Sequence, residues 1–325
     1  MTAYTGIQGQ NILIVSSDPA NPVEGQIWYN STSNLLKGYQ LAPGTWATGG
    51  NLPATRAEIG GAGTQTAALG FGGFNSPPFT TYADAFKYDG TSWTATGSMI
   101  NGRMQMASAG TQTAAFGAGG YAQPVGRTEN FNGTSWTSSG NLNTNRRLIS
   151  GAGTQTAGLA LGGYSYPPGA LTTAEAYTGS TWANITSLPA ASNGGSAFGT
   201  QTAALYTASS GPAFPNTSSI FWNGSSWTAG GSLNSGRSSA SSSGTDTAGI
   251  IFGGSPAGTA TELYNGTSFS NSGNLSTPRY QIGGARSAPN SAALGFGGYS
   301  YPSNFKNNTE EFTGAALATR TITTS

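Results

Sequence analysis

The amino-acid sequence predicts an all-β fold of six similar four-stranded sheets, and three features support this prediction. The stretch Gly63-Thr-Gln-Thr-Ala-Ala-Leu-Gly-Phe-Gly-Gly-Phe74 recurs five more times, the last time in altered form. The copies begin at Thr64, Thr111, Thr154, Thr200, Thr245 and Asn290, which lie 43 to 47 residues apart. The pairs Asp89-Gly90, Asn132-Gly133, Asn223-Gly224 and Asn265-Gly266 suit two-residue hairpin turns. A period of this length is typical of one blade of a β-propeller.

The sequence pattern of each repeat unit predicts four strands, which we designate a to d in chain order. A run of small residues after an arginine forms strand a, and the repeated stretch that ends in Gly-Gly forms strand b. A segment with an acid and an aromatic residue forms strand c, and an aromatic residue begins strand d. These d-strand aromatics are Trp93, Trp136, Trp182, Trp227 and Phe269. Small residues let the inner strands converge near the axis, while aromatic residues fill the widening gaps between blades.

This order of elements resembles the kelch repeat, because arginine, small-residue strand, Gly-Gly, aromatic residue and tryptophan recur in the same order in most units. The resemblance covers about residues 44 to 314 of the chain. It implies a six-bladed kelch-like β-propeller with a short N-terminal β segment. Enzymes and binding proteins both use this fold, so the resemblance leaves the function open.

The prediction divides the chain into an N-terminal attachment segment, residues 1–43, and the propeller, residues 44–325. The closing strand of the last blade has two candidates. Trp46 stands in a segment that reads as a strand d without its own a, b and c strands, so it would complete the sixth blade. Alternatively, residues 315–325 form the last strand and Trp46 belongs to the N-terminal segment.

Five arginines and five acids recur at matching positions: Arg56 with Asp84, Arg103 with Glu129, Arg146 with Glu175, Arg237 with Glu262, and Arg279 with Glu310. The fourth unit lacks both, with Asn193 and Ser219 in their places and Ser209-Ser210 in place of Gly-Gly. A buried charge that loses its partner costs about 3 to 5 kcal/mol. The joint loss therefore indicates a structural ion pair in each of five blades. The alternative is an anion-binding ring of arginines at the mouth of the channel.

One face of the predicted propeller gathers aromatic residues. In a four-stranded blade the b–c and d–a connections share a face, and the b–c connections here carry prolines beside Tyr and Phe. Such rigid loops lose little conformational entropy on binding. The residues expected to contact a partner are Phe79, Tyr121, Tyr166, Phe214 and Tyr301. The alternative is that these rings only cover the ends of neighbouring blades.

The composition argues against several functions. Charged residues make up 7% of the chain and the net charge is +1, so the basic surface of a nucleic-acid-binding protein is not expected. Without Cys or His the chain has no Ser-His-Asp triad, no thiolate nucleophile and no metal ligands of those types. We therefore expect no catalytic residue, no metal, no cofactor and no enzymatic activity. A pair of unmatched carboxylates in a cleft would instead favour glycoside hydrolysis.

The N-terminal segment indicates a biological setting. The chain contains no apolar run of about 18 residues and no signal peptide, so membrane insertion is not expected. The segment Gly25 to Tyr39, which follows a proline-rich stretch, resembles a short β-hairpin module of bacteriophage tail and appendage proteins.

This second resemblance implies a virion protein, such as a bacteriophage tail fibre, tail appendage or tail-decorating component, assembled in the host cytoplasm. The N-terminal segment would bind other virion proteins, and the propeller would present a face to a host-surface glycan or to a virion protein. We also expect a homo-oligomer within the assembly. The alternatives are a lectin or carbohydrate-active enzyme, and a purely architectural subunit that binds copies of itself.

Overall fold

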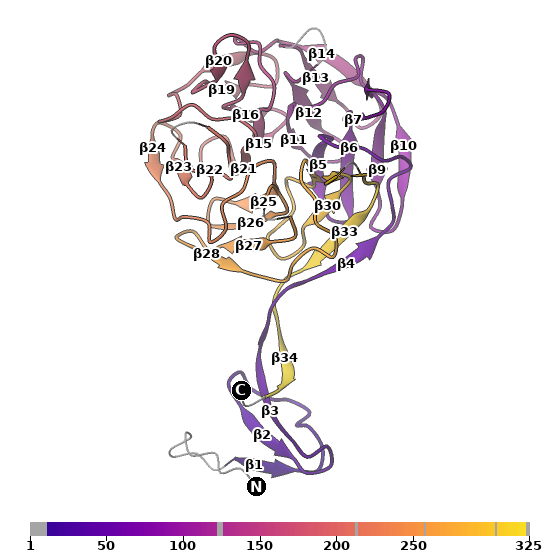
Figure 1. Cartoon of the computed structure of the whole chain (residues 1–325), viewed down its shortest axis with the longest axis vertical. Coiled ribbons are helices and arrows are strands. Elements are labelled where there is room, and N and C mark those ends of the chain that lie inside the picture. The colour runs from indigo at the N-terminus through magenta and orange to yellow at the C-terminus, as the bar shows by residue number, and fades with distance from the viewer. Residues whose placement is uncertain (1–11, 122–125, 212–213, 257, 303, 323–325) are drawn as a thin grey trace. The chain divides into compact units, whose positions relative to one another are not determined.

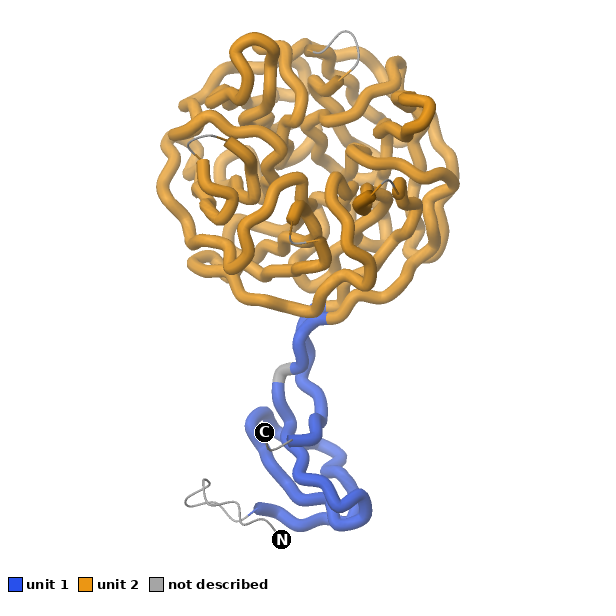
Figure 2. The backbone as a smooth tube through the Cα atoms, in the orientation of Figure 1, with its two compact units in different colours: residues 1–44, 314–325 blue, residues 45–313 orange. Residues whose placement is uncertain are grey.

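The computed structural model describes residues 12–121, 126–211, 214–256, 258–302 and 304–322. Within these residues the regular structure consists of strands, with no helix among them. The chain forms two compact units: residues 45–313, and a smaller unit of residues 1–44 with residues 314–325 (Figure 2).

The larger unit is a six-bladed β-propeller, in which six four-stranded antiparallel sheets surround a common centre (Figure 1). Blade 1 comprises β5 (Gly60–Thr64), β6 (Ala67–Phe71), β9 (Ala85–Tyr88) and β10 (Trp93–Thr96). Blade 2 comprises β11 (Ala107–Gly110), β12 (Ala115–Ala118), β13 (Thr128–Phe131) and β14 (Trp136–Ser139). Blade 3 comprises β15 (Ser150–Thr154), β16 (Ala157–Leu161), β19 (Ala174–Tyr177) and β20 (Trp182–Asn184). Blade 4 comprises β21 (Ser196–Gly199), β22 (Ala204–Thr207), β23 (Ser219–Trp222) and β24 (Trp227–Ala229), and blade 5 comprises β25 (Ser241–Thr245), β26 (Ala248–Phe252), β27 (Thr261–Tyr264) and β28 (Phe269–Asn271).

The sixth blade joins the two ends of the propeller. It comprises β29 (Gly283–Gly284), β30 (Leu294–Phe296), β33 (Thr309–Thr313) and, from the start of the unit, β4 (Thr45–Gly49). Trp46 pairs with Phe312 in the register that Trp93 has with Tyr88 in blade 1. Trp46 is therefore the closing d-strand residue, and the alternative in which the C-terminal residues close the ring does not hold.

The smaller unit is a four-stranded sheet in the order β1 (Leu13–Val15), β2 (Ile27–Asn30), β3 (Leu35–Ala42) and β34 (Ala316–Thr321). The expected division of the chain, in which the propeller extended to residue 325, is wrong at the C-terminal end. Six residues of β34 pair with β3, and this pairing assigns residues 314–325 to the smaller unit. Inside the unit, hydrogen bonds from Lys37, Asn30 and Trp28 to Asp18 hold the pKa of that carboxyl at about 2.

Small residues in the innermost strands allow the blades to approach closely. A Cβ atom on Gly61 of β5 would lie 2.2 Å from the carbonyl oxygen of Gly284 in β29, and one on Gly151 would lie 2.5 Å from the nitrogen of Ser108. The outer gaps are filled by the d-strand aromatics. Nε1 of Trp93 donates to Oγ1 of Thr309 in the preceding blade at 2.9 Å. Alternation of small inner and large outer residues thus shapes each blade as a wedge.

Glutamines of the a–b turns form a second link between blades. Gln112 Nε2 donates to the carbonyl oxygens of Ala68 and Tyr88 in the preceding blade, at 3.1 and 2.7 Å. Gln65, Gln155 and Gln201 make the equivalent pairs of bonds. Blade 5 carries Asp246 at this position, whose side chain has no N–H to donate.

We predict that replacing Trp46 weakens ring closure. Its ring centroid lies 4.8 Å from that of Phe252 and 5.2 Å from that of Phe312, and its Nε1 donates to Thr261 Oγ1. Trp46→Ala should lower the free energy of unfolding by about 2 to 3 kcal/mol, below the usual cost of a fully buried tryptophan because Trp46 is half-buried. Chemical denaturation measures this loss, and Trp46→Phe should recover part of it. An unchanged stability in Trp46→Ala would contradict the closing role.

Candidate functional site

All five predicted arginine–acid ion pairs are present, and four of them are fully enclosed. Arg103 donates to Glu129 Oε1 at 3.1 Å and to the carbonyl oxygens of Gly117 and Gly119 at 3.2 and 3.1 Å. Arg146, Arg237 and Arg279 are held in the same manner by Glu175, Glu262 and Glu310 and by backbone carbonyls. Burial lowers the pKa of Arg103 to about 10, and the Glu129 carboxylate opposes this shift. These guanidinium groups face their own blades, so they do not form the alternative ligand ring.

The same residues also link adjacent blades through their backbone. The carbonyl oxygen of Arg103 accepts the N–H of Gly73 in the preceding blade at 2.8 Å. Those of Arg146, Arg279 and Arg56 accept N–H groups from Gly120, Gly254 and Gly298. Glu129 Oε2 meanwhile accepts the N–H of Ile100, in the connection that carries Arg103. One buried pair therefore fixes a d–a connection, its own strand c and the end of strand b in the preceding blade.

The pair in blade 1 differs from the others. Strand c of this blade has Phe86 at the position of Glu129, because Tyr88 and Phe131 occupy equivalent places opposite Trp93 and Trp136. Asp84, two residues earlier, supplies the carboxylate, at 2.6 Å from Arg56 Nη2. The Asp84 side chain is 53% exposed, so solvent screens this ion pair far more than the enclosed ones.

Blade 4 lacks the ion pair, as expected, but the substituted positions require correction. The bridge of Asn193 with Ser210 matches that of Arg147 with Tyr164, so Ser192 rather than Asn193 replaces the arginine. By the same alignment Ile220, not Ser219, replaces the acid, and Ala208-Ser209 replace Gly-Gly. The fully buried Tyr206 donates to or accepts from the Ser192 hydroxyl at 2.8 Å, and burial raises the Tyr206 pKa to about 12. A neutral cluster thus occupies the space of the charged pair.

Four of the five predicted contact residues lie on the surface of one face. Tyr166 and Tyr301 are 88% and 87% exposed, while Phe79 and Tyr121 are 54% and 39% exposed. Phe214 was expected there as well, and this expectation is wrong. Phe214 is 5% exposed and packs its ring 5.7 Å from that of Tyr206, because the neutral interior of blade 4 has room for an aromatic side chain.

The aromatic residues of this face form a continuous row over four blades. Short hairpins on the b–c connections carry it: β7 (Phe74–Asn75) with β8 (Thr80–Thr81), β17 (Tyr164–Ser165) with β18 (Gly169–Ala170), and β31 (Tyr299–Ser300) with β32 (Asn304–Phe305). Ring centroids 5.0 to 6.0 Å apart connect Tyr280, Tyr299, Phe305, Phe74, Phe79 and Tyr121 in that order. The guanidinium of Arg147 continues the row, at 4.9 Å from the Tyr121 ring and 5.3 Å from the Tyr164 ring.

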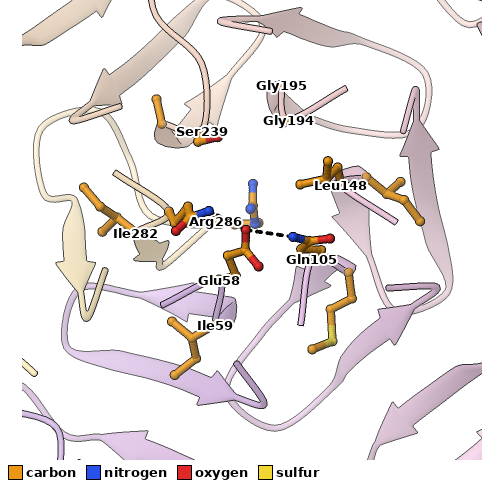
Figure 3. A pocket seen from close by; sticks show the side chains of 13 residues that line it. Glu58, Ile59, Gln105, Leu148, Gly194, Gly195, Ser239, Ile282 and Arg286 are labelled. Atoms are coloured by element: carbon orange, nitrogen blue, oxygen red, sulfur yellow. Dashed lines mark hydrogen bonds between the residues drawn. The ribbon is translucent and has the colours of Figure 1, made fainter. Parts of the chain in front are cut away.

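A small hollow of about 70 Å³ lies at the centre of the ring (Figure 3). One residue per blade surrounds it in the left-handed backbone conformation: Glu58, Gln105, Leu148, Gly194, Ser239 and Gln281, with φ between 52° and 62°. Backbone hydrogen bonds of 2.8 to 3.0 Å join four neighbouring pairs of these residues, as in Ser239 N–H to Gly194 C=O. The Oε1 atom of Glu58 accepts hydrogen bonds from both Gln105 and Gln281. Burial nevertheless raises the pKa of Glu58 to about 7, against the lowering effects of the Gln105 bond and the nearby Arg147 charge.

The sequence interpretation assigned no role to Glu58, Arg147 or the linking glutamines. Arg147 follows directly after a recurrent arginine, and that position in the other blades holds Ala57, Met104, Asn193, Ser238 and Tyr280, so no repeat marks it. The glutamines do recur, at Gln65, Gln112, Gln155 and Gln201, and their spacing could have indicated an inter-blade role.

Within the described ranges, no group of three or more His, Cys, Asp or Glu residues could hold a metal ion. Nor do those ranges include a helix long and apolar enough to cross a membrane.

Comparisons with known proteins support the fold. No family model and no curated protein matches the chain. Among solved structures, one described as the structure of YjhT matches with a TM-score of 0.64 at 13% sequence identity, over 82% of this chain and 99% of that one. At this identity the likeness is one of fold alone.

We predict strong coupling within an enclosed pair. Arg146→Ala and Glu175→Ala should each cost about 3 to 5 kcal/mol, since each leaves a buried charge without its partner. The double variant should cost clearly less than the sum, with a coupling above about 1 kcal/mol in chemical denaturation. The matched control is the same double-mutant cycle on Arg56 and Asp84. Its coupling energy should stay below about 1 kcal/mol because Asp84 is solvated. Additive losses at Arg146 and Glu175 would contradict the enclosed contact.

A second prediction concerns pH. The pKa of Glu58 is about 7 in the folded protein, against 4.5 for an ordinary glutamate, so the folded state binds more protons between these values. The free energy of unfolding therefore falls as pH rises from about 4.5 through 7. Glu58→Gln removes this dependence. The variant should match the wild type near pH 4 and exceed it at pH 8 by about 1 kcal/mol or more, measured by thermal denaturation across pH. Parallel pH profiles of stability for the wild type and Glu58→Gln would refute the raised pKa of Glu58 as the cause of the pH dependence.

Proposed function

We propose that the protein is a bacteriophage virion component, a tail fibre, appendage or tail-decorating protein, whose smaller unit attaches to the particle and whose propeller binds a target. One observation carries the proposal. The described residues include eleven exposed large apolar side chains, six of which belong to the small unit: Leu13, Ile14, Val23, Ile27, Leu35 and Leu317. The other five lie on the b–c and d–a connections of one propeller face: Phe79, Ile100, Tyr121, Tyr166 and Tyr301. Exposed apolar groups gathered in this way mark interaction sites.

The small unit has the properties of an attachment module. A four-stranded sheet of this size buries little apolar surface by itself, and the buried large apolar residues among its described side chains are Trp28 and Leu36. Ile14 and Val23 are 71% and 67% exposed. The outer edges of β1 and β34 have no strand beside them among the described residues, and such edges offer N–H and C=O groups to another chain. These features favour binding to another virion protein or to a second copy of the chain.

The propeller favours binding over catalysis. Five of its acids are bound to arginines, and Asp89 accepts hydrogen bonds from Thr91 and Ser92 within a hairpin turn. Glu311 accepts a hydrogen bond from the hydroxyl of Tyr88. The exposed tyrosines supply the flat, rigid contact surface that dominates many binding interfaces. The target that we favour is a host-surface glycan. In this proposal the propeller acts as a lectin that is carried on the virion.

The two roles can be separated by substitution. Tyr166→Ala with Tyr301→Ala should weaken target binding by about 2 kcal/mol for each ring that contacts the target, roughly 30-fold each. Stability should not change, because both side chains are almost fully exposed. Particles carrying this variant should assemble normally and adsorb poorly to host cells.

Ile14→Ser with Val23→Ser is the complementary variant, since both side chains belong to the small unit. It should reduce the amount of protein in purified particles while leaving target binding by the free protein intact. Each variant is the control for the other. Unaltered incorporation and adsorption in both would rule out the proposed function.

A further inference from the structure

We infer that the hollow beside Arg147 binds a saccharide that carries a carboxylate group, with the Arg147 guanidinium as the recognising group. This inference deepens the proposed function, on which it rests for the assumption that this face meets a host surface. The hollow has a volume of about 450 Å³ and lies between blades 2 and 3. Tyr121, Tyr164 and Tyr166 line it with aromatic rings, and Asn145 and Ser165 add polar groups.

Arg147 is the charged group of the hollow that remains available. Its neighbour Arg146 is bound to Glu175 and to backbone carbonyls, so its donors are directed away. The Arg147 side chain makes no hydrogen bond or ion pair with the described residues; it contacts the rings of Tyr121 and Tyr164, and its charge acts on the Glu58 carboxylate from a distance. Two aromatic contacts hold the planar group in place and leave its N–H donors free. A guanidinium held in this way suits a carboxylate, which can accept two parallel N–H bonds.

The distribution of charge over the propeller supports an anionic ligand. Once the five ion pairs are set aside, the connections of the aromatic face hold Arg127, Arg147 and Lys306, against the half-buried Glu58. The opposite face holds Asp89, Asp246 and Glu311, against Lys87 and the half-buried Arg286 of an a–b connection. The two faces therefore carry opposite net charge although the chain as a whole is nearly neutral. A positive face raises the local concentration of an anionic partner.

The aromatic walls favour a sugar ring over a simple anion. A free carboxylate or inorganic ion would use Arg147 alone and leave most of the 450 Å³ hollow empty. A sugar ring has an apolar face that can pack on Tyr166, which is 88% exposed. Its hydroxyl groups can bind the Asn145 side chain, which lies exposed at the same hollow. Tyrosine surfaces adapt well to ligands of this mixed polarity.

The decisive test compares two forms of one ligand. Binding of the full-length purified protein to an oligogalacturonate, an oligoalginate and a hyaluronan oligosaccharide is measured by calorimetry, each beside the same oligosaccharide with its carboxyls methyl-esterified. We expect at least one acidic form to bind, and its ester to bind roughly ten- to hundredfold more weakly, since a hydrogen bond to a charged group is lost. The difference should shrink at high salt. Failure of all three acidic forms to bind, or equal binding of acid and ester, overturns the inference.

Variants then assign the recognising group. Arg147→Gln should bind the acid no better than the ester, and Arg147→Lys should recover only part of the difference, because lysine lacks the planar pair of donors. Lys306→Gln is the matched control, since it removes one positive charge from the same face at blade 6 and should retain the preference. Tyr166→Ala should weaken both forms alike. Equal effects of Arg147→Gln and Lys306→Gln would show only long-range attraction and would refute the site. Particle incorporation and host adsorption are measured separately, so the proposed function can fail while this site stands.

Discussion

The buried arginine found in five of the six d–a connections is the interaction on which the propeller depends. In four of the five, its carbonyl oxygen accepts a glycine N–H of the preceding blade, and its guanidinium binds a carboxylate and carbonyls of its own blade, as Arg103 does. Blades built from four short strands have small individual cores, so their relative positions must be fixed at the boundaries between them. The arginines do this near one face and the turn glutamines do it near the other. The b–c connections contain neither the arginines nor these glutamines, and four of the exposed aromatic side chains lie on them.

The sequence was sufficient to predict the blades because the determinants are local. Hairpin turns, alternating strands and the tryptophan of strand d repeat with the period, so six copies of one pattern specify six sheets. The ion pairs were predictable for a related reason: the unit without arginine is also the unit without an acid. Ring closure required more, since β4 and β33 are separated by most of the chain, and only the similarity of the Trp46 segment to other d strands connected them.

The errors arose where a side chain's surroundings are set by other elements. Phe214 lies in a proline-rich connection like the exposed aromatics, but the loss of the ion pair in blade 4 opened an interior site for it. Asp84 was aligned with the glutamates although it lies two residues earlier, since one acid per unit looks equivalent in sequence. The pKa of Glu58 could not be predicted either, because six connections meet around it at the axis.

The way in which the chain enters and leaves the propeller has a mechanical consequence. Thr45 and Thr313 are paired, so both covalent links to the small unit leave from the same end of blade 6, and within that unit β3 and β34 are paired as well. A pull applied through both links draws β4 and β33 in the same direction, so it does not slide one strand past the other. The load passes instead to the bonds between β33 and β30 and to the contacts of blade 6 with its neighbours. A propeller linked to the chain in this way can bear tension without first opening its ring.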